Sequence, residues 1–255
     1  MKAKVLILRT AGTNCDKETE FAFETARAKS FLYHINYVKA KNNLSDYQII
    51  AIPGGFSYGD DLGAGKIFSL ELLLWLRNEL ENFIKNDGLI IGICNGFQVL
   101  VKTGILPDLD FKQKVTLTNN DSERFEDRWV YLKAQNAKRK TQSIWLKGLP
   151  EIITLPVAHG EGKFYADKDI LDKIEKNNQV ALRYVDEKLN SAGYPFNPNG
   201  SLNNIACIID KTGRILGLMP HPERFIFEHH WPFWKEKRVV PFGLRFFQNA
   251  VDYFK

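Results

Sequence analysis

The sequence predicts an α/β fold in which a mostly parallel central sheet has helices on both faces and additional antiparallel strands. In the first half of the chain, short continuous apolar runs alternate with amphipathic segments. That alternation is typical of strands buried on both faces and joined by helices. In the second half, apolar runs follow one another through short polar turns, as antiparallel strands do.

The elements of the first half are predicted from apolar periodicity and from helix start and stop signals. Strands are expected at 4–9, 32–38, 48–52 and 88–93, and helices at 17–29 (capped by Asp16), 67–86 and 95–104 (closed by Gly104).

The second half is predicted to be rich in strands, with a closing helix at 242–254 that docks on the sheet. The turn Asp-Lys-Thr-Gly (210–213) predicts a hairpin and therefore an antiparallel pair. Strands are expected within 114–120, 128–135, 152–159, 179–185, 204–210 and 213–220.

Composition predicts one globular domain over residues 1–255. Apolar residues make up 44% and charged residues 25% of the 255 residues, which are ordinary globular proportions. The length suffices for one sizeable core, and no linker, repeat or low-complexity tract interrupts it.

Charge and cysteine usage exclude several functional classes. The net charge of +5 is mild, and the one basic cluster, 138–140, has no interleaved aromatic residues, so we expect a solvated loop and no nucleic-acid partner. Three widely spaced cysteines do not make a disulfide framework. No apolar run approaches the roughly 20 residues that span a bilayer, and no signal-peptide pattern is present. We therefore expect a cytoplasmic protein without membrane contact.

Cys94 is predicted to be a catalytic nucleophile. It lies in Gly92-Ile93-Cys94-Asn95-Gly96, directly after a predicted strand and before a predicted helix. This is the nucleophile-elbow pattern, in which flanking glycines permit a tight, strained turn that presents the nucleophile above the sheet. The helix that follows directs its N–H groups and its positive dipole end toward the sulfur. The alternative, a small buried apolar residue, does not explain the coincidence of these signals.

The other two cysteines are interpreted differently. Cys207 lies within an apolar run and is expected in the core. Cys15 lies close to a helix start but lacks flanking glycines, so we favour a structural role over an activated thiol.

His221 and Glu223 are predicted to complete a triad with Cys94. They lie in Met219-Pro220-His221-Pro222-Glu223, directly after a predicted strand, where open α/β sheets place their sites. The proline at 222 favours an extended backbone at His221, and residues i and i+2 of an extended chain point to the same face. A turn-capping loop histidine is the alternative.

The glycine-rich segment 53–60 is predicted to supply an oxyanion hole. Its glycines let the backbone approach a substrate, and the N–H groups of Gly55 and Asn95 are the expected donors. A mobile loop is the alternative. The run at 63–66 is not a phosphate loop, because the required first glycine and the final Ser or Thr are missing.

The segment His159-Gly160-Glu161-Gly162 is interpreted as a tight turn near the site, with direct catalysis as the alternative. It is not a zinc-deaminase motif, because no Pro-Cys-x-x-Cys follows. No other metal-ligand spacing appears, and no metal is expected.

These motifs resemble those of class I, triad-type glutamine amidotransferases, which have a flavodoxin-like fold. Further runs resemble the glutaminase subunits of phosphoribosylformylglycinamidine synthase, and the similarity covers nearly the whole chain. The chain departs from the commoner small-subunit form at 59–66 and in a longer segment at 191–206, and both departures are expected to affect docking. The similar segments are 92–98, 220–223, 9–26, 52–68, 122–130, 157–164 and 213–224.

The resemblance implies a residue-by-residue assignment. Cys94 would attack the side-chain amide of glutamine, and His221, oriented by Glu223, would protonate the departing ammonia and then activate water. Gly54 and Gln98 would help to bind glutamine, and the segment 119–125 would contact its amino-acid end.

The resemblance also implies partners. The ammonia would pass to a large synthetase subunit, with or without a small bridging subunit, and ATP and Mg²⁺ would bind that partner while this chain carries no cofactor. The aromatic segment 225–234 is a candidate docking surface, and packing on its own core is the equal alternative.

Two other functions remain open from sequence. One is a cysteine peptidase or a related α/β hydrolase that uses the same elbow. The other is a non-enzymatic docking or regulatory subunit with a decayed triad, which the competent residues at all three triad positions disfavour.

Overall fold

A nine-stranded sheet runs through the computed structural model, which describes residues 2–41, 43–135, 143–191 and 193–255. The strand order is β2-β1-β3-β4-β11-β10-β9-β6-β7, and a separate two-stranded sheet pairs β5 with β8. The basic cluster at 138–140 lies outside the described residues.

Five neighbouring strands form the parallel half of the sheet. The apolar residues of the four inner strands are buried, as expected for strands covered on both faces, whereas those of the edge strand are only partly buried. Because the strands run in the same direction, their carboxyl ends meet at one edge of the sheet. In sheet order they are β2 (Lys29–His34), β1 (Lys4–Arg9), β3 (Ile49–Ile52), β4 (Leu89–Ile93) and β11 (Ile215–Leu218).

The remaining strands continue the sheet in antiparallel pairs, and the predicted α/β class with added antiparallel strands is confirmed. These strands are β10 (Ile205–Ile209), β9 (Val180–Val185), β6 (Glu126–Ala134) and β7 (Ile152–His159). The separate pair consists of β5 (Val115–Thr118) and β8 (Lys163–Ala166).

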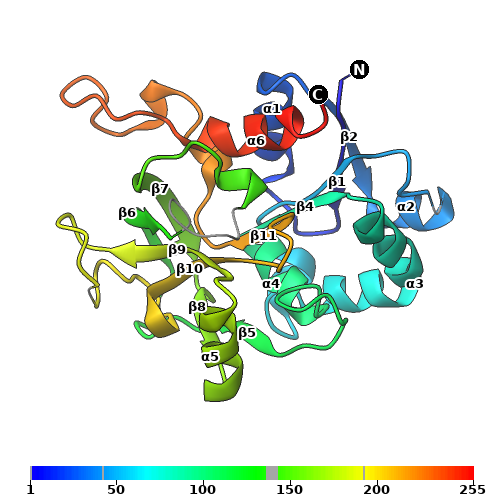
Figure 1. The fold of residues 1–255 in the computed structure, drawn as a ribbon, viewed down its shortest axis with the longest axis horizontal. Helices are drawn as coiled ribbons and strands as arrows, with labels where there is room; N and C mark the ends of the chain where they lie inside the picture. The colour runs from blue at the N-terminus through cyan, green and yellow to red at the C-terminus, as the bar shows by residue number, and fades with distance from the viewer. Residues whose placement is uncertain (1, 42, 136–142, 192) are drawn as a thin grey trace.

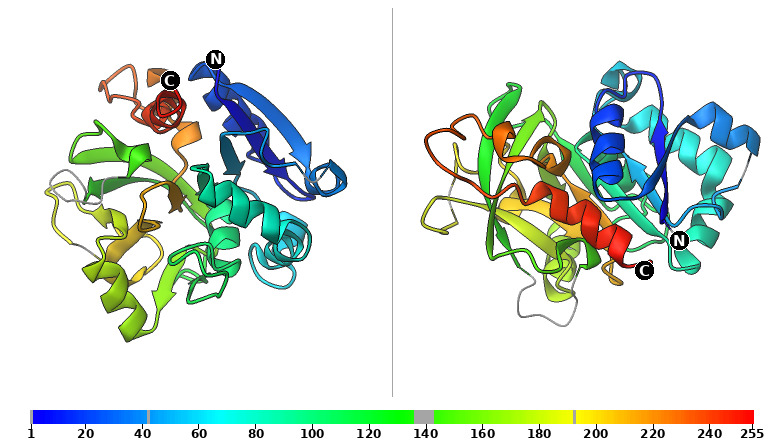
Figure 2. Two further views of the ribbon diagram at one scale, coloured as in Figure 1. Left: turned by 45° about the vertical axis from the view of Figure 1, so that its right-hand side comes forward. Right: turned by 90° about the horizontal axis from the view of Figure 1, so that it is seen from above.

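Helices cover both faces of the parallel half. Figures 1 and 2 show α1 (Asp16–Thr25) beside α6 (Gly243–Asp252) on one side, with α3 (Lys66–Lys85) and α4 (Asn95–Lys102) on the other. On α3, the buried residues recur every three or four positions, which is the spacing of one helix face; they include Phe68, Leu72, Leu76, Leu80 and Phe83. The shorter helical elements are α2 (Ile35–Lys41), α5 (Lys168–Lys176), η1 (Ser57–Asp60), η2 (Ile144–Leu146), η3 (Leu202–Asn204), η4 (Pro222–Arg224) and η5 (Glu228–His230).

Three predictions of local structure were wrong. The expected strand 32–38 ends at His34 and continues as α2, where Ile35 and Val38 are buried one helical turn apart. Asp16 does not cap α1, because the cap residue is Cys15 and the helix stops at Thr25. The elements β8 and α5 were not predicted, since their apolar patterns are short.

The predicted hairpin joins β10 to β11. Cys207 pairs with Leu218 in antiparallel register, and Cys207 is fully buried in the core as expected. The Asp210 carboxylate accepts hydrogen bonds from the backbone N–H groups of Thr212, Arg214 and Ile215 across the turn. The turn leads into β11, which pairs with β4. The loop after β11 contains His221, the predicted catalytic base.

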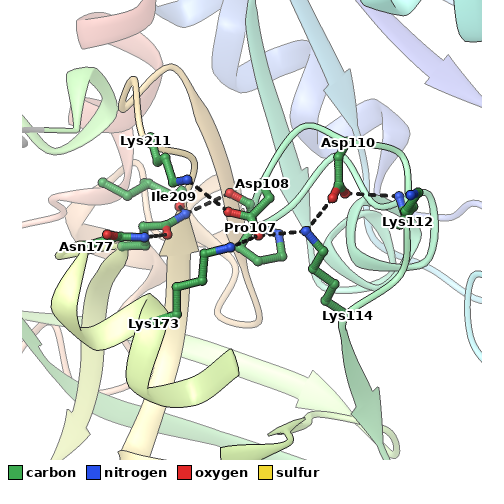
Figure 3. A network of polar contacts seen from close by, with 10 residues as sticks. Pro107, Asp108, Asp110, Lys112, Lys114, Lys173, Asn177, Ile209 and Lys211 are labelled. Carbon is green, nitrogen blue, oxygen red and sulfur yellow. Dashed lines mark hydrogen bonds and ion pairs between the residues drawn. The ribbon is translucent and has the colours of Figure 1, made fainter. Parts of the chain in front are cut away.

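Asp108 ties three segments together beside the β10–β11 turn (Figure 3). Its carboxylate lies 2.8 Å from Lys114 Nζ, 3.0 Å from Lys173 Nζ and 3.3 Å from Lys211 Nζ. Burial alone raises the pKa of Asp108, but the hydrogen bonds from these three lysines outweigh it and lower the pKa to about 2. The cluster joins the loop after α4 to α5 and to the β10–β11 turn.

The loops that follow β1, β3, β4 and β11 gather at the carboxyl edge of the parallel strands. These four strands are consecutive neighbours in the sheet, so their loops lie side by side. They contain Cys15, Gly54, Cys94 and His221. Within the described ranges, no helix has the length and apolar character required to cross a membrane.

Candidate active site

Cys94 occupies the sharp turn between β4 and α4. Its backbone has φ 51° and ψ −106°, a conformation that strains a residue with a β-carbon. The turn is possible because Gly96 has no side chain, since a β-carbon there would lie 1.8 Å from the Ile52 carbonyl oxygen. The thiol is almost fully buried and lies 3.7 Å from the Ala158 carbonyl oxygen. The elbow geometry predicted from the glycine spacing is therefore present.

His221 and Glu223 form a buried pair after β11. The His221 Nδ1 atom lies 2.7 Å from Glu223 Oε1, and the side chains are 2% and 0% exposed. His221 is extended, as predicted, and its N–H donates to the Pro156 carbonyl oxygen at 2.9 Å. Glu223 lies in the 3-10 turn η4 and not in an extended segment, so the turn, and not strand alternation, brings its carboxylate to the imidazole.

Gly54 marks the point where the side chains of the site converge. A β-carbon at this position would lie 2.9 Å from His221 Cε1, 3.1 Å from Cys15 Sγ and 3.4 Å from Cys94 Cβ. The structure therefore brings the predicted nucleophile and the predicted base to the same residue. Gly54 was predicted to bind substrate. In the structure, the absence of a side chain at Gly54 leaves the space in which the His221 imidazole and the Cys94 side chain come together.

The charge of His221 depends on its neighbours. Burial by itself lowers the pKa of His221, but the Glu223 carboxylate and the nearby sulfurs of Cys94 and Cys15 outweigh burial and hold it well above its ordinary value. The Nε2 atom of His221 is buried and has no hydrogen-bond partner among the described residues. This arrangement favours a protonated imidazole beside the Cys94 sulfur, and a cationic neighbour of this kind makes a cysteine more nucleophilic.

The predicted oxyanion donors lie beside Cys94. Gly55 follows β3, and Asn95 begins α4, so its N–H is one of the unsatisfied donors at a helix start. Neither N–H donates a hydrogen bond to another residue in the described part of the chain. Gly55 has φ 141°, and a β-carbon there would lie 2.7 Å from the Asn14 nitrogen, so only glycine fits this close approach.

The Asn95 side chain fixes the elbow to the glycine-rich segment. Its Oδ1 accepts from the Ser57 N–H at 3.3 Å, and its Nδ2 donates to Asp60 Oδ1 at 3.2 Å. The same Nδ2 donates to Gln98 Oε1 at 2.9 Å. Because the two proposed donors belong to these two segments, the Asn95 side chain sets their relative position.

Gln98 is buried and connects the elbow helix to the 159–162 turn. Its Nε2 donates to the Glu161 carbonyl oxygen, and the Glu161 carboxylate accepts from the Ala64 N–H at 3.2 Å. Gln98 thus lies at the site, but each end of its amide already has a partner within the chain. Its predicted contact with glutamine stays a prediction.

His159 is a buried, neutral histidine. Burial, followed by the charge of His221, lowers its pKa to about 3. Its ring lies between Asn120, 3.2 Å from Nδ1, and Asn199, 3.4 Å from Nε2. The predicted turn is present, since β7 ends at His159 and β8 begins at Lys163.

The longer segment 191–206 contributes to the support of this turn. Asn199 and Ser201 are buried, and Ser201 Oγ accepts from the Phe164 N–H at 2.9 Å. The sequence predicts a role in docking for this segment. Its role within the fold was missed because polar residues in a loop give no sequence signal of burial.

A cleft of about 680 Å³ opens beside the site. The segment predicted to contact the amino-acid end of glutamine forms most of its wall, together with Gly160 and Glu161; the lining residues of that segment are Asn119, Asn120, Asp121, Glu123, Arg124 and Phe125. Its polar and charged wall suits the amino and carboxylate groups of an amino acid.

The aromatic segment 225–234 divides into two parts. Phe225 is fully buried, and its ring packs edge-on against Trp129, as does the ring of Trp231. Phe233 and Trp234 are exposed. The first part therefore packs on the core, and docking stays a prediction for the second.

Cys15 is a site residue that sequence reasoning missed. It follows β1, is almost fully buried, and accepts a hydrogen bond from Arg224 Nη2 at 3.1 Å. Burial raises the pKa of the Cys15 thiol, although the neighbouring His221 imidazole acts against it. The signal available in the sequence was its position shortly after the first buried strand, since the carboxyl ends of such strands carry the sites of α/β sheets.

The chain resembles known glutamine amidotransferase proteins over essentially its whole length. The model of the CobB/CobQ-like glutamine amidotransferase domain matches residues 2–254. Phosphoribosylformylglycinamidine synthase subunit PurQ of Dehalococcoides mccartyi is 48% identical, covering 99% of this chain and 98% of that protein. The protein of the same name from Methanococcus maripaludis is 41% identical, covering 100% and 99%. A chain in the structure of PurLQS from Thermotoga maritima has a TM-score of 0.76 at 31% identity, with full coverage of both chains.

Proposed function

The chain belongs to the family of CobB/CobQ-like glutamine amidotransferase domains, and from this membership we propose that it is the glutaminase subunit of a phosphoribosylformylglycinamidine synthase. It hydrolyses glutamine to glutamate and ammonia. A large synthetase subunit uses the ammonia and ATP to convert formylglycinamide ribonucleotide to formylglycinamidine ribonucleotide in purine biosynthesis. The similarity of this chain, over its full length, to PurQ proteins and to a chain of PurLQS supports this assignment. The structural observation that carries the chemistry is the convergence of Cys94 and His221 at Gly54.

The first step of the proposed mechanism is attack by the Cys94 sulfur on the side-chain amide carbon of glutamine. The imidazolium of His221 supports the thiolate before attack. When the tetrahedral intermediate collapses, His221 gives its proton to the departing nitrogen, which leaves as ammonia, and a γ-glutamyl thioester remains on Cys94. Glu223 keeps the imidazole oriented and stabilises its positive charge.

The Gly55 and Asn95 N–H groups stabilise the oxyanion of this intermediate. Both are free to donate, and both belong to segments that the Asn95 side chain holds together. Donors fixed before the reaction stabilise developing charge without reorganisation, and each contributes on the order of 3 kcal/mol in related sites.

Hydrolysis of the thioester completes the cycle. The neutral imidazole of His221 takes a proton from water, and the resulting hydroxide attacks the thioester carbon. The carbon–sulfur bond breaks, glutamate leaves, and the Cys94 thiolate is restored beside a protonated His221.

The partner completes the function. The ammonia must reach the large synthetase subunit before it escapes to solvent, so the two subunits act as a docked complex. We place ATP and Mg²⁺ on that subunit and no cofactor on this chain. We place the complex in the cytoplasm, where the Cys94 thiol stays reduced.

Cys94→Ser tests the proposal in the complex with the synthetase. We expect synthesis from glutamine to be abolished, while synthesis from added ammonium continues at the wild-type rate. A variant that retains glutamine-driven synthesis would remove Cys94 from the mechanism. Turnover of a peptide substrate by the wild-type complex, without turnover of glutamine, would replace the assignment with a cysteine peptidase.

A further inference from the structure

A second thiol lies in the site and has no role in the proposed mechanism. Cys15 lies in the loop after β1, close to the imidazole of His221, and the residue is 2% exposed. A β-carbon at Gly54 would touch the Cys15 sulfur and His221 Cε1 at 3.1 Å and 2.9 Å. Cys15 therefore lies against the same imidazole as the nucleophile does.

Three side chains of different chemistry meet at this place. One ligand atom from each of Cys15, His221 and Glu223 lies within 4.8 Å of the others, and all three residues are buried. Sulfur, imidazole nitrogen and carboxylate oxygen are the donors that bind Zn²⁺ and related soft divalent ions. The ligands come from positions 15, 221 and 223, so no local spacing in the sequence reveals the set.

Two buried polar atoms in this group lack partners. Among the described residues, His221 Nε2 and Glu223 Oε2 have no hydrogen-bond partner, although their residues are 1% and 2% exposed. Buried polar atoms are nearly always satisfied, so a bound ligand, water or ion would complete the polar contacts of this group. Both belong to the side chains that converge with the Cys15 sulfur.

We propose that Cys15, His221 and Glu223 form a binding site for a soft divalent cation such as Zn²⁺ or Cd²⁺, and that occupancy blocks the catalytic imidazole. On binding, the Cys15 thiol releases its proton to solvent, and a ring nitrogen of His221 must be unprotonated to bind the ion. The imidazole can then neither stabilise the Cys94 thiolate nor transfer protons. The inhibitory consequence rests on the proposed function, whereas metal binding does not.

The surroundings of Cys15 suit a metal thiolate. Arg224 Nη2 lies 3.1 Å from the Cys15 sulfur, and Arg224 Nε lies 2.8 Å from Glu18 Oε2, which fixes the guanidinium. A hydrogen-bond donor held behind a ligating atom orients it toward the metal.

Spectroscopic titration of the full-length chain with Cd²⁺ tests binding without any activity assay. We expect thiolate-to-metal charge-transfer absorption in the wild type and in Cys94→Ser. Cys15→Ala should lose this absorption and bind Cd²⁺ at least about tenfold more weakly. Cys15→Ser offers a second variant, with a hydroxyl in place of the thiol, should alanine perturb folding. No absorption in the wild type, or absorption that persists in Cys15→Ala and disappears in Cys94→Ser, overturns the site.

Inhibition is tested in the complex with the synthetase. Zn²⁺ should suppress glutamine-driven synthesis while ammonium-driven synthesis at the same Zn²⁺ concentration continues. Inhibition of Cys15→Ala, relative to its own metal-free rate, should need at least about tenfold more Zn²⁺. Equal inhibition of both variants overturns the inhibitory role. If the metal-free wild type makes no product from glutamine, the proposed function fails, while the Cd²⁺ titration still decides the metal site.

Discussion

The His221 imidazole and the Glu223 carboxylate meet at 2.7 Å in side chains that water barely reaches. In the sequence, only Pro222 separates the two residues. Pro222 begins the 3-10 turn that brings the Glu223 carboxylate back to Nδ1 of His221. A hydrogen bond in a buried environment that excludes water orients the imidazole strongly and stabilises its protonated form.

Glu223→Gln should therefore impair catalysis more than folding. Glutamine keeps the size of the side chain but removes the charge that holds the imidazolium. We expect glutamine-driven synthesis by the complex to fall by about 10²–10⁴-fold, the range typical of general acid–base groups. Ammonium-driven synthesis is the control and should be unchanged. A loss of less than tenfold would mean that Glu223 does not orient the base.

Gly54→Ala should disrupt the meeting of nucleophile and base. The new β-carbon would lie 2.9 Å from His221 Cε1, so the ring must shift by a few tenths of an ångström or more. Because displacement of a catalytic group by about 1 Å can cost 10²-fold, we expect a loss of that order in the glutamine-driven rate. Gly193→Ala is the matched control, since a β-carbon there meets nothing within 4 Å. Similar effects of the two substitutions would contradict the packing argument.

Asn95→Ala should loosen the oxyanion hole. The substitution removes the hydrogen bonds with Ser57, Asp60 and Gln98 while the backbone donor at position 95 remains. We expect the rate constant for glutamine hydrolysis in the complex to fall by about 10–10², and unfolding to become easier by about 1–3 kcal/mol. Steady-state kinetics and denaturant titration measure the two effects. A rise in KM with kcat unchanged would show that Asn95 serves substrate binding.

Asp108→Asn should reduce stability in a pH-dependent way. The folded pKa of Asp108 is about 2, below its ordinary 3.8, so the stabilisation is present above 3.8 and disappears as pH falls through about 2. At neutral pH we expect the free energy of unfolding to fall by about 2 kcal/mol, because three lysines lose a charged partner.

Urea unfolding at a series of pH values measures this effect. The difference between wild type and Asp108→Asn should narrow as pH is lowered from 3.8 toward 2. Asp252→Asn is the control, since its pair with Lys255 is exposed and contributes little. A difference that is independent of pH would show that the charge of Asp108 is not the cause.

Phe233 and Trp234 should contribute to assembly with the synthetase. They are 57% and 45% exposed, and large aromatic side chains are common energetic anchors in interfaces. We expect the double substitution to serine to raise the Kd for the synthetase subunit at least about tenfold. Leu74→Ser, on a residue of α3 that is 78% exposed, is the control. An unchanged Kd would exclude these aromatic residues from the interface.

The elbow could be predicted because its determinants are local. Gly92, Cys94 and Gly96 lie within five positions, and the strand before them and the helix after them each have a clear apolar pattern. The His221 assignment had the same basis, a strand end followed by prolines. Its contact with Glu223 was predicted for the wrong reason, since the sequence did not reveal the 3-10 turn.

The contacts that could not be predicted connect distant parts of the chain. The Arg224–Cys15 hydrogen bond joins residues 209 positions apart, and Asn199 meets His159 from 40 positions away. Such pairs depend on the order of strands in the sheet, which apolar periodicity does not determine. The prediction of a strand at 32–38 was wrong for a different reason. The β-branched and aromatic residues there favour a strand locally, but the chain forms α2, which buries Ile35 and Val38 on one helix face.

The central claim is that glutamine is attacked by the sulfur of Cys94 and not by that of its neighbour Cys15. Rapid acid quenching of the complex during turnover of isotopically labelled glutamine, followed by peptide mapping, tests it most directly. The account predicts a γ-glutamyl thioester on the peptide that contains Cys94, and none when Cys94 is serine. Label on the Cys15 peptide, or turnover without any covalent label, would contradict it.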